Sequence, residues 1–150
     1  QTKNVFPSMT VEENLQMGGF IRKDDISNTI NEVYELFPIL YEKRKQLAEQ
    51  LSGGQRQQVA FGRAMMTKPS IMLLDEPTAG VSPIVMDEIF SNILDVKNAG
   101  MAVLMVEQNA QQALNIADKG FVLVSGRNEH TGTGKELIND NEVRKKFLGG

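Results

Sequence analysis

The pattern of apolar positions changes near residue 55. Before it, apolar residues recur at helical spacing and predict a helix that ends at Pro38, as at Ile26, Ile30, Val33 and Phe37. A capping-box pair, Thr10 and Glu13, predicts an earlier short helix that stops at Gly18-Gly19. Residues 43–50 predict a further short turn or helix. The first fifty residues are therefore expected to be helical.

From residue 55 onward, helical and strand patterns alternate. Helices are predicted at about 55–67, 82–100 and 109–117. Strands are predicted at 70–74, 101–106, 121–124 and 128–131, the last two joined by a turn at Ser125-Gly126. Strands separated by helices are typical of βαβ units, so we expect an α/β fold with a parallel sheet.

Three later helix starts carry capping residues. Ser82 precedes Pro83, which suits an N-cap followed by proline at the first helical position. Asn109, with Gln112 three residues on, predicts a second cap. Thr133 with Glu136 predicts a capping box into the last helices.

Composition restricts the function classes. The 150 residues carry a net charge of -3 and no cysteine, and their short basic stretches are interleaved with acids. A phosphate-tracking basic surface is therefore not expected, and neither is a nucleic-acid partner. Disulfides and thiolate metal sites are excluded. The longest apolar run, 101–106, is too short to cross a bilayer, so membrane association is expected to run through a partner.

The segment Leu51-Ser52-Gly53-Gly54-Gln55 has the composition of an anion-binding helix start. Ser52 and Gln55 have capping-box spacing, and the two glycines let the backbone approach a phosphate closely. Free N–H groups and the positive end of the helix dipole favour an anion there. An ordinary glycine-containing helix cap explains the segment equally well when it is taken alone.

Two adjacent carboxylates, Asp75 and Glu76, follow the apolar segment 71–74. We expect a buried strand that delivers them to the carboxyl edge of the sheet, where ligands bind in parallel sheets. Neighbouring residues of a strand point to opposite faces, which predicts different tasks for the two acids. Without other motifs, a structural turn after a strand remains the simpler interpretation.

Together these segments resemble the ATP-binding cassette (ABC) transporter ATPases. The LSGGQ signature stands at residues 51–55, continues through 56–64 as in that family, and is followed by a Walker B segment at 71–76. The resemblance implies a partial P-loop NTPase fold of the RecA-like, ABC type, with a parallel sheet and a helical subdomain. Residues 1–51 would form the Q-loop and helical subdomain, and 52–150 the C-terminal part of the ATPase core.

The resemblance also implies a site for ATP and Mg²⁺. Asp75 would hold Mg²⁺, Glu76 would polarise the attacking water as general base, and Gln1, at the Q-loop position, would contact the metal or the water. Ser52, Gly53, Gly54 and Gln55 would reach the γ-phosphate of ATP held by a second ATPase subunit. Residues 78–83 occupy the place of the D-loop, with Ser82 where many members have aspartate.

One position departs from the family pattern. After the strand 101–106 most members carry a histidine that contacts the γ-phosphate, and this chain has Gln108 there. Glutamine can donate a hydrogen bond to a phosphate oxygen but carries no imidazolium charge. Gln108 is thus a candidate catalytic residue of altered chemistry. The only histidine, His130, is expected to be structural.

The phosphate loop G-x-x-x-x-G-K-[ST] does not occur in the 150 residues. The segment 132–135 imitates its end, but the upstream glycine is missing and Glu136 replaces the hydroxyl residue that binds magnesium. We interpret the chain as the C-terminal part of a transporter ATPase whose front is not included.

The function expected from the resemblance is ATP hydrolysis that powers an importer, with motifs most similar to those of branched-chain amino-acid importers. The expected partners are a second ATPase subunit (homo- or heterodimer), an integral membrane permease and, indirectly, a solute-binding protein. The expected location is the cytoplasmic face of the membrane. Two alternatives remain: an inactive, self-associating fragment, and a soluble ABC ATPase of DNA repair or translation.

Overall fold

The computed structural model describes residues 4–148, which fall into two compact units that divide between Met105 and Val106. The first unit holds the residues up to Met105, and the second those from Val106. The sequence-based division into residues 1–51 and 52–150 follows family motifs and not compactness, and it stays a prediction.

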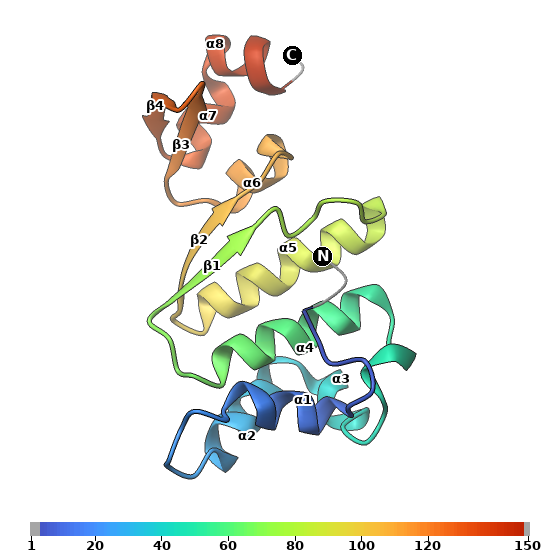
Figure 1. Cartoon of the computed structure of the whole chain (residues 1–150). Helices are drawn as coiled ribbons and strands as arrows, with labels where there is room; N and C mark the ends of the chain where they lie inside the picture. The colour runs from blue at the N-terminus through green and yellow to red at the C-terminus, as the bar shows by residue number, and fades with distance from the viewer. Residues whose placement is uncertain (1–3, 149–150) are drawn as a thin grey trace. The chain divides into compact units, whose positions relative to one another are not determined.

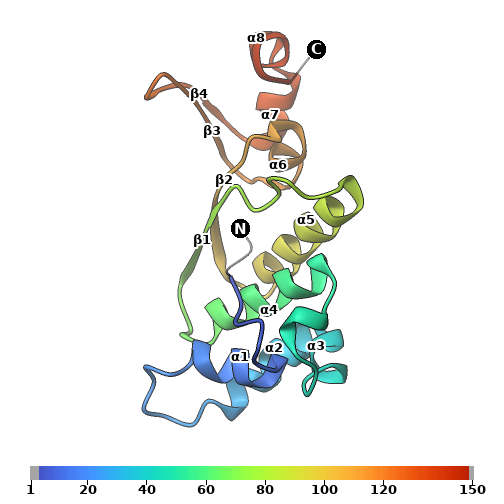
Figure 2. The same ribbon diagram turned by 45° about the vertical axis from the view of Figure 1, so that its right-hand side comes forward.

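The first unit opens with a helical layer. Its elements are α1 (Val11–Gly18), α2 (Ser27–Leu36), α3 (Pro38–Glu42), a 3-10 turn η1 (Ala48–Gln50) and α4 (Gly53–Met65). Figures 1 and 2 show α1, α2 and α3 gathered around α4. Their apolar sides meet in a dry core made of Val11, Leu15, Val33, Phe37, Leu40, Val59, Phe61 and Met66.

Close approach of α1 to α4 depends on glycine. A Cβ atom on Gly18 would lie 2.5 Å from the carbonyl oxygen of Arg63, and one on Gly62 would lie 2.7 Å from a methyl group of Val33. The first neighbour is backbone and cannot move aside cheaply. The helical layer is thus fixed against the signature helix α4.

The first unit continues as one βαβ segment. Strand β1 (Ile71–Asp75), helix α5 (Pro83–Asn98) and strand β2 (Ala102–Val106) follow in order, β1 pairs with β2, and both arrows point the same way in Figure 1. The parallel arrangement confirms the α/β prediction. Helix α5 packs against α4, with a hydrogen bond from Gln58 to Asn92 at 3.0 Å. The buried residues of α5 are Ile89, Phe90, Asn92, Ile93 and Val96.

The prediction of a buried strand at 71–74 is only half right. Met72 is buried, whereas Leu73 is 69% exposed, and Leu104 of β2 is 54% exposed. Side chains alternate between the faces of a strand, so one face of this sheet packs on helices and the other is apolar and uncovered among the described residues.

The second unit is small. It contains α6 (Ala110–Ile116), the strands β3 (Gly120–Val124) and β4 (Arg127–Gly132), α7 (Gly134–Asn139), α8 (Asn141–Val143) and a π-helical turn η2 (Arg144–Leu148). The two strands form an antiparallel hairpin, with Ser125 and Gly126 in left-handed conformation at the turn. That turn confirms the predicted hairpin.

The predicted caps divide into two groups. All three capping boxes form, at Thr10, Ser52 and Thr133. Ser82 and Asn109 occupy the predicted N-cap positions, and Pro83 follows Ser82 in the first turn, but neither side chain makes a cap hydrogen bond. The sequence pattern does not predict helix α3, because Pro38 begins a new helix as well as ending the previous one.

Candidate functional site

The signature segment starts a helix with its amide groups organised for an anion. Ser52 is the N-cap, its hydroxyl accepts from the Gln55 N–H at 3.2 Å, and the Gln55 side chain accepts from the Ser52 N–H at 3.1 Å. The box satisfies two donors and leaves the N–H groups of Gly53 and Gly54 at the positive end of α4.

The surroundings of the two glycines differ. A Cβ atom on Gly53 would have as its nearest neighbour a methyl of Val85 at 4.0 Å, so this face of the backbone is open. A Cβ atom on Gly54 would lie 2.0 Å from a carboxylate oxygen of Glu88. Helix α5, which follows the predicted D-loop, therefore lines the signature with Val85 and Glu88.

The acid pair stands at the carboxyl end of β1. Asp75 is the last residue of the strand and is exposed, whereas Glu76 is half-buried and has a φ of 44°, in the left-handed region. Its carbonyl accepts from the Ala79 N–H at 3.1 Å, which closes a turn that ends near Gly80 (φ 73°). Left-handed backbone in a non-glycine residue is strained and gathers at functional positions.

The expectation that both acids lie on one strand is wrong, because β1 ends at Asp75 and the chain leaves the strand at Glu76. Asp75 is exposed and Glu76 is half-buried. The expectation of different environments for Asp75 and Glu76 remains, with a different physical cause.

Figures 1 and 2 show α4 and β1 running in opposite directions. The Ser52 end of α4 and the carboxyl end of β1 therefore lie toward the same end of the first unit. Because the chain reverses direction between α4 and β1, the N–H groups at the start of α4 and the acids Asp75 and Glu76 lie at the same end of the first unit.

Gln108 belongs to the second unit. Its loop is organised by Glu107, whose carboxylate oxygen Oε1 accepts from the N–H of Gln108 at 2.9 Å and of Asn109 at 3.1 Å. Both N–H groups precede α6, whose N-cap position is held by Asn109. Gln108 itself is exposed.

Gln1 lies outside the described residues, but the segment from Asn4 onward is held firmly. The guanidinium of Arg63 on α4 donates to the carbonyl of Asn4 and lies 4.4 Å from the ring centre of Phe6. The fully buried Asn14 makes hydrogen bonds with both the N–H and the carbonyl of Phe6. Burial lowers the pKa of Arg63 from its ordinary value.

Magnesium needs few protein ligands. Within residues 4–148 no group of three or more acidic or histidine side chains gathers to form a metal cage. Mg²⁺ is commonly held by one or two carboxylates, with water and substrate phosphates completing its shell. The exposed carboxylate of Asp75 suits that mode.

No helix within residues 4–148 is both long and apolar enough to span a lipid bilayer.

The imitation phosphate loop has a structural explanation. The Thr133 hydroxyl accepts from the Glu136 N–H at 3.2 Å, and the Glu136 carboxylate accepts from the Thr133 N–H at 2.7 Å. A Cβ atom on Gly134 would lie 2.0 Å from the carbonyl oxygen of Leu114. Gly134 is thus required by packing, and this helix start is blocked.

A family model described as ABC transporter matches residues 1–79. The chain belongs to the ABC transporter family. A similar solved structure is MJ1267, an ATP-binding cassette of an ABC transporter in its ADP conformation. It superposes on this chain with a TM-score of 0.79 at 29% identity, and the match covers 96% of this chain and 64% of MJ1267.

Curated relatives carry transport names. The branched-chain amino acid transport ATP-binding protein BraG of Pseudomonas aeruginosa is 47% identical over 99% of this chain and 64% of its own length. A probable branched-chain amino acid transport protein, LivF of Archaeoglobus fulgidus, is 40% identical over 99% of this chain and 64% of its own length. The chain thus spans 64% of the length of these relatives.

Sequence reasoning missed the residues that support the site. Glu88 lies against Gly54, Glu107 accepts from the N–H of Gln108, and Arg63 donates to the carbonyl of Asn4. Of the three, only Glu107 is close in sequence to the residue that it contacts. The contacts of Glu88 and Arg63 join residues far apart in sequence.

Proposed function

We propose that the native protein hydrolyses ATP and that these residues form the signature and Walker B parts of its site. The reaction is attack of water on the γ-phosphate, in which positioning and charge neutralisation do most of the catalysis. Glu76 orients the water and accepts its proton, and Asp75 holds Mg²⁺ through its water shell. When bound, Mg²⁺ neutralises charge on the phosphate oxygens.

The other site residues bind phosphate from a second subunit. The N–H groups of Gly53 and Gly54, with Ser52 and Gln55, take the γ-phosphate of the opposite nucleotide, so two ATPase subunits close on shared ATP. Gln108 donates a hydrogen bond where a histidine is usual, and Gln1 completes the contacts to metal or water.

The left-handed backbone at Glu76, directly after an exposed Asp75, is the observation that carries this proposal. Glu76→Gln in the native full-length protein is expected to keep Mg-ATP binding and to lower turnover by about 100-fold or more. Asp87→Asn on α5 is the matched control for loss of one acid. Undiminished hydrolysis in the Glu76 variant would refute the role given to Glu76.

We further propose that the solute is a branched-chain amino acid and that the protein sits on the cytoplasmic face of the membrane. The partners are a permease and, through it, a solute-binding protein. The names of the two relatives, at 47% and 40% identity, support this class of solute. Copurification with a permease, and ATP-dependent uptake of leucine by the reconstituted complex, test it. Copurification with nucleic acid or ribosomes would favour the soluble alternative.

A second candidate concerns the 150 residues by themselves. The uncovered apolar face of the β1–β2 sheet, with Leu73 and Leu104 exposed, favours self-association without hydrolysis. Sedimentation of the 150-residue chain tests this, and a monomer at high concentration contradicts it. The phosphate loop that ATP binding requires is absent from this sequence, and Mg-ATP titration of the same chain tests that requirement.

A further inference from the structure

A cavity of about 540 Å³ lies within the first unit, away from the signature and the acid pair. It is bounded by α2, by the end of α4 with the following residues 68–69, and by residues 99–101 after α5. Its volume falls in the usual range for small-molecule sites. None of its lining residues belongs to the nucleotide site proposed above.

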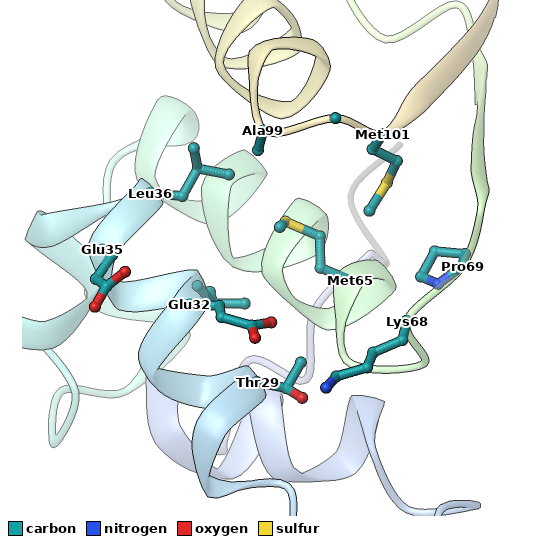
Figure 3. A pocket seen from close by; sticks show the side chains of 11 residues that line it. Thr29, Glu32, Glu35, Leu36, Met65, Lys68, Pro69, Ala99 and Met101 are labelled. Atoms are coloured by element: carbon teal, nitrogen blue, oxygen red, sulfur yellow. The ribbon is translucent and has the colours of Figure 1, made fainter.

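One end of the cavity is polar and carries Glu32 and Lys68, and a third charged residue of the lining, Glu35, lies one turn further along α2. Figure 3 shows Glu32 and Thr29 of α2 and the ammonium of Lys68 gathered on the same side. Thr29 is only 2% exposed, and its hydroxyl oxygen accepts from Arg22 at 2.8 Å, which leaves the hydroxyl hydrogen for another acceptor. Lys68 has a φ of 50°, and its N–H donates to the Met65 carbonyl at 2.8 Å.

The other end is apolar. Met65 and Met101 line this end together with Leu36 and Ala99 (Figure 3). Methionine is flexible and adapts to ligands of different shape. The cavity therefore joins a dipolar end to an aliphatic end.

We propose that this cavity binds an aliphatic α-amino acid. The ligand's carboxylate pairs with Lys68 and Thr29, its ammonium pairs with Glu32, and its side chain lies between Met65 and Met101. A fatty acid is disfavoured by Glu32 and an aliphatic amine by Lys68, so the opposed charges select a zwitterion. An amino acid fills part of the volume, and water completes the polar contacts.

This inference rests on the cavity and not on the proposed ATPase function. Its test is therefore made without nucleotide, by calorimetric titration of the native full-length protein with L-leucine up to about 10 mM, the range of weak specific binding. Two probes isolate the charges: 4-methylpentanoate lacks the ammonium, and 3-methylbutylamine lacks the carboxylate. ATP hydrolysis is measured separately, so that failure of one proposal leaves the other intact.

Single substitutions locate the site. Glu32→Gln and Lys68→Asn each remove one charge, and asparagine tolerates the left-handed backbone at residue 68. Each is expected to weaken leucine binding about tenfold or more, the usual effect of losing one charged hydrogen bond. Glu42→Gln is the matched control, because Glu42 is exposed on α3 and does not line the cavity.

Saturable leucine binding that both probes fail to reproduce, and that the Glu42 variant retains, supports the proposal. Absence of saturable binding in the wild type overturns it. Equal binding of leucine and either probe overturns the zwitterion requirement, and equal weakening in all three variants overturns the location. If one variant does not fold by circular dichroism, the probe series on the wild type still decides the question.

Discussion

Two helix starts in this chain have nearly the same local structure and opposite chemistry. Ser52 and Thr133 are both N-caps of capping boxes, with φ and ψ of -64° and 165° in the first and -65° and 156° in the second. Each is followed by glycine. The hydrogen bond from N3 to the cap hydroxyl measures 3.2 Å in both. Local sequence rules describe the two helix starts equally well.

Their surroundings separate them. At the first start the N3 side chain is the neutral Gln55 and the space beside Gly53 is open, while the carboxylate of Glu88 on α5 lies beside the next residue, Gly54. At the second, the carboxylate of Glu136 already lies at the helix end, and Gly134 is pressed against the carbonyl of Leu114. A helix start binds phosphate only where its amides are reachable and its own acid does not compete. A glycine-rich cap therefore becomes a site through what packs beside it.

The largest effect is expected from alanine at the two glycines. Gly134→Ala forces a methyl against backbone, so it is expected to lower the free energy of unfolding by about 3 kcal/mol. Gly53→Ala meets open space and is expected to change stability by less than about 1 kcal/mol, in the stabilising direction. Urea unfolding followed by circular dichroism measures both. Equal losses of unfolding free energy in the two variants would contradict the proposed difference between the two helix starts.

The cap hydroxyls are expected to be equivalent. Ser52→Ala and Thr133→Ala each remove one cap hydrogen bond and are expected to cost about 1 kcal/mol. The same unfolding assay checks this, with Ser82→Ala as control, since the Ser82 side chain makes no cap hydrogen bond. A cost for the Ser82 variant equal to the others would contradict the assignment of the caps.

The smallest effect is the response to acid. Hydrogen bonds from Thr133 lower the pKa of Glu136 below its ordinary value of 4.5. A carboxyl whose pKa falls on folding stabilises the folded chain above its unfolded pKa, and the contribution is lost as the pH falls through the lowered value. The cap at Thr133 should thus weaken below about pH 4.5.

The Ser52 cap has no titrating partner, because Gln55 is neutral. NMR titration of the Ser52 and Thr133 amide signals between about pH 7 and pH 3 compares them, and Glu136→Gln should abolish the Thr133 response. A persistent response in that variant would assign the titration to another group. The Thr10 box, whose Glu13 also has a lowered pKa through hydrogen bonds from Thr10, should respond as Thr133 does.

The sequence predicts the features of the fold that depend on periodicity or on neighbouring residues. The capping boxes, the helix α4, the strands β1 and β2 and the hairpin depend on residues close in sequence, and the structure confirms them. The sequence correctly predicts Asp75 and Glu76 at a strand end, whereas the left-handed turn at Glu76 could not be inferred from its neighbours. Whether Gln1 and Gln108 act with these acids stays a prediction.

The features that were missed depend on distant contacts. Asn109 stands at the N-cap position without a side-chain cap hydrogen bond, and the N–H of Asn109 donates to the Glu107 carboxylate. Glu88 meets Gly54 and Arg63 meets Asn4 only once α5 and α4 are folded. The half-exposed sheet arises because no described segment covers the side of Leu73, which an apolar run cannot reveal.

The contrast between the two helix starts is tested by NMR titration of the native full-length protein with Mg-ATP, following the amide signals of Gly53, Gly54 and Gly134. The account predicts saturable shifts at Gly53 and Gly54 and none at Gly134. Shifts at Gly134 equal to those at Gly53, or no response at Gly53 and Gly54 while ATP is bound, would contradict it.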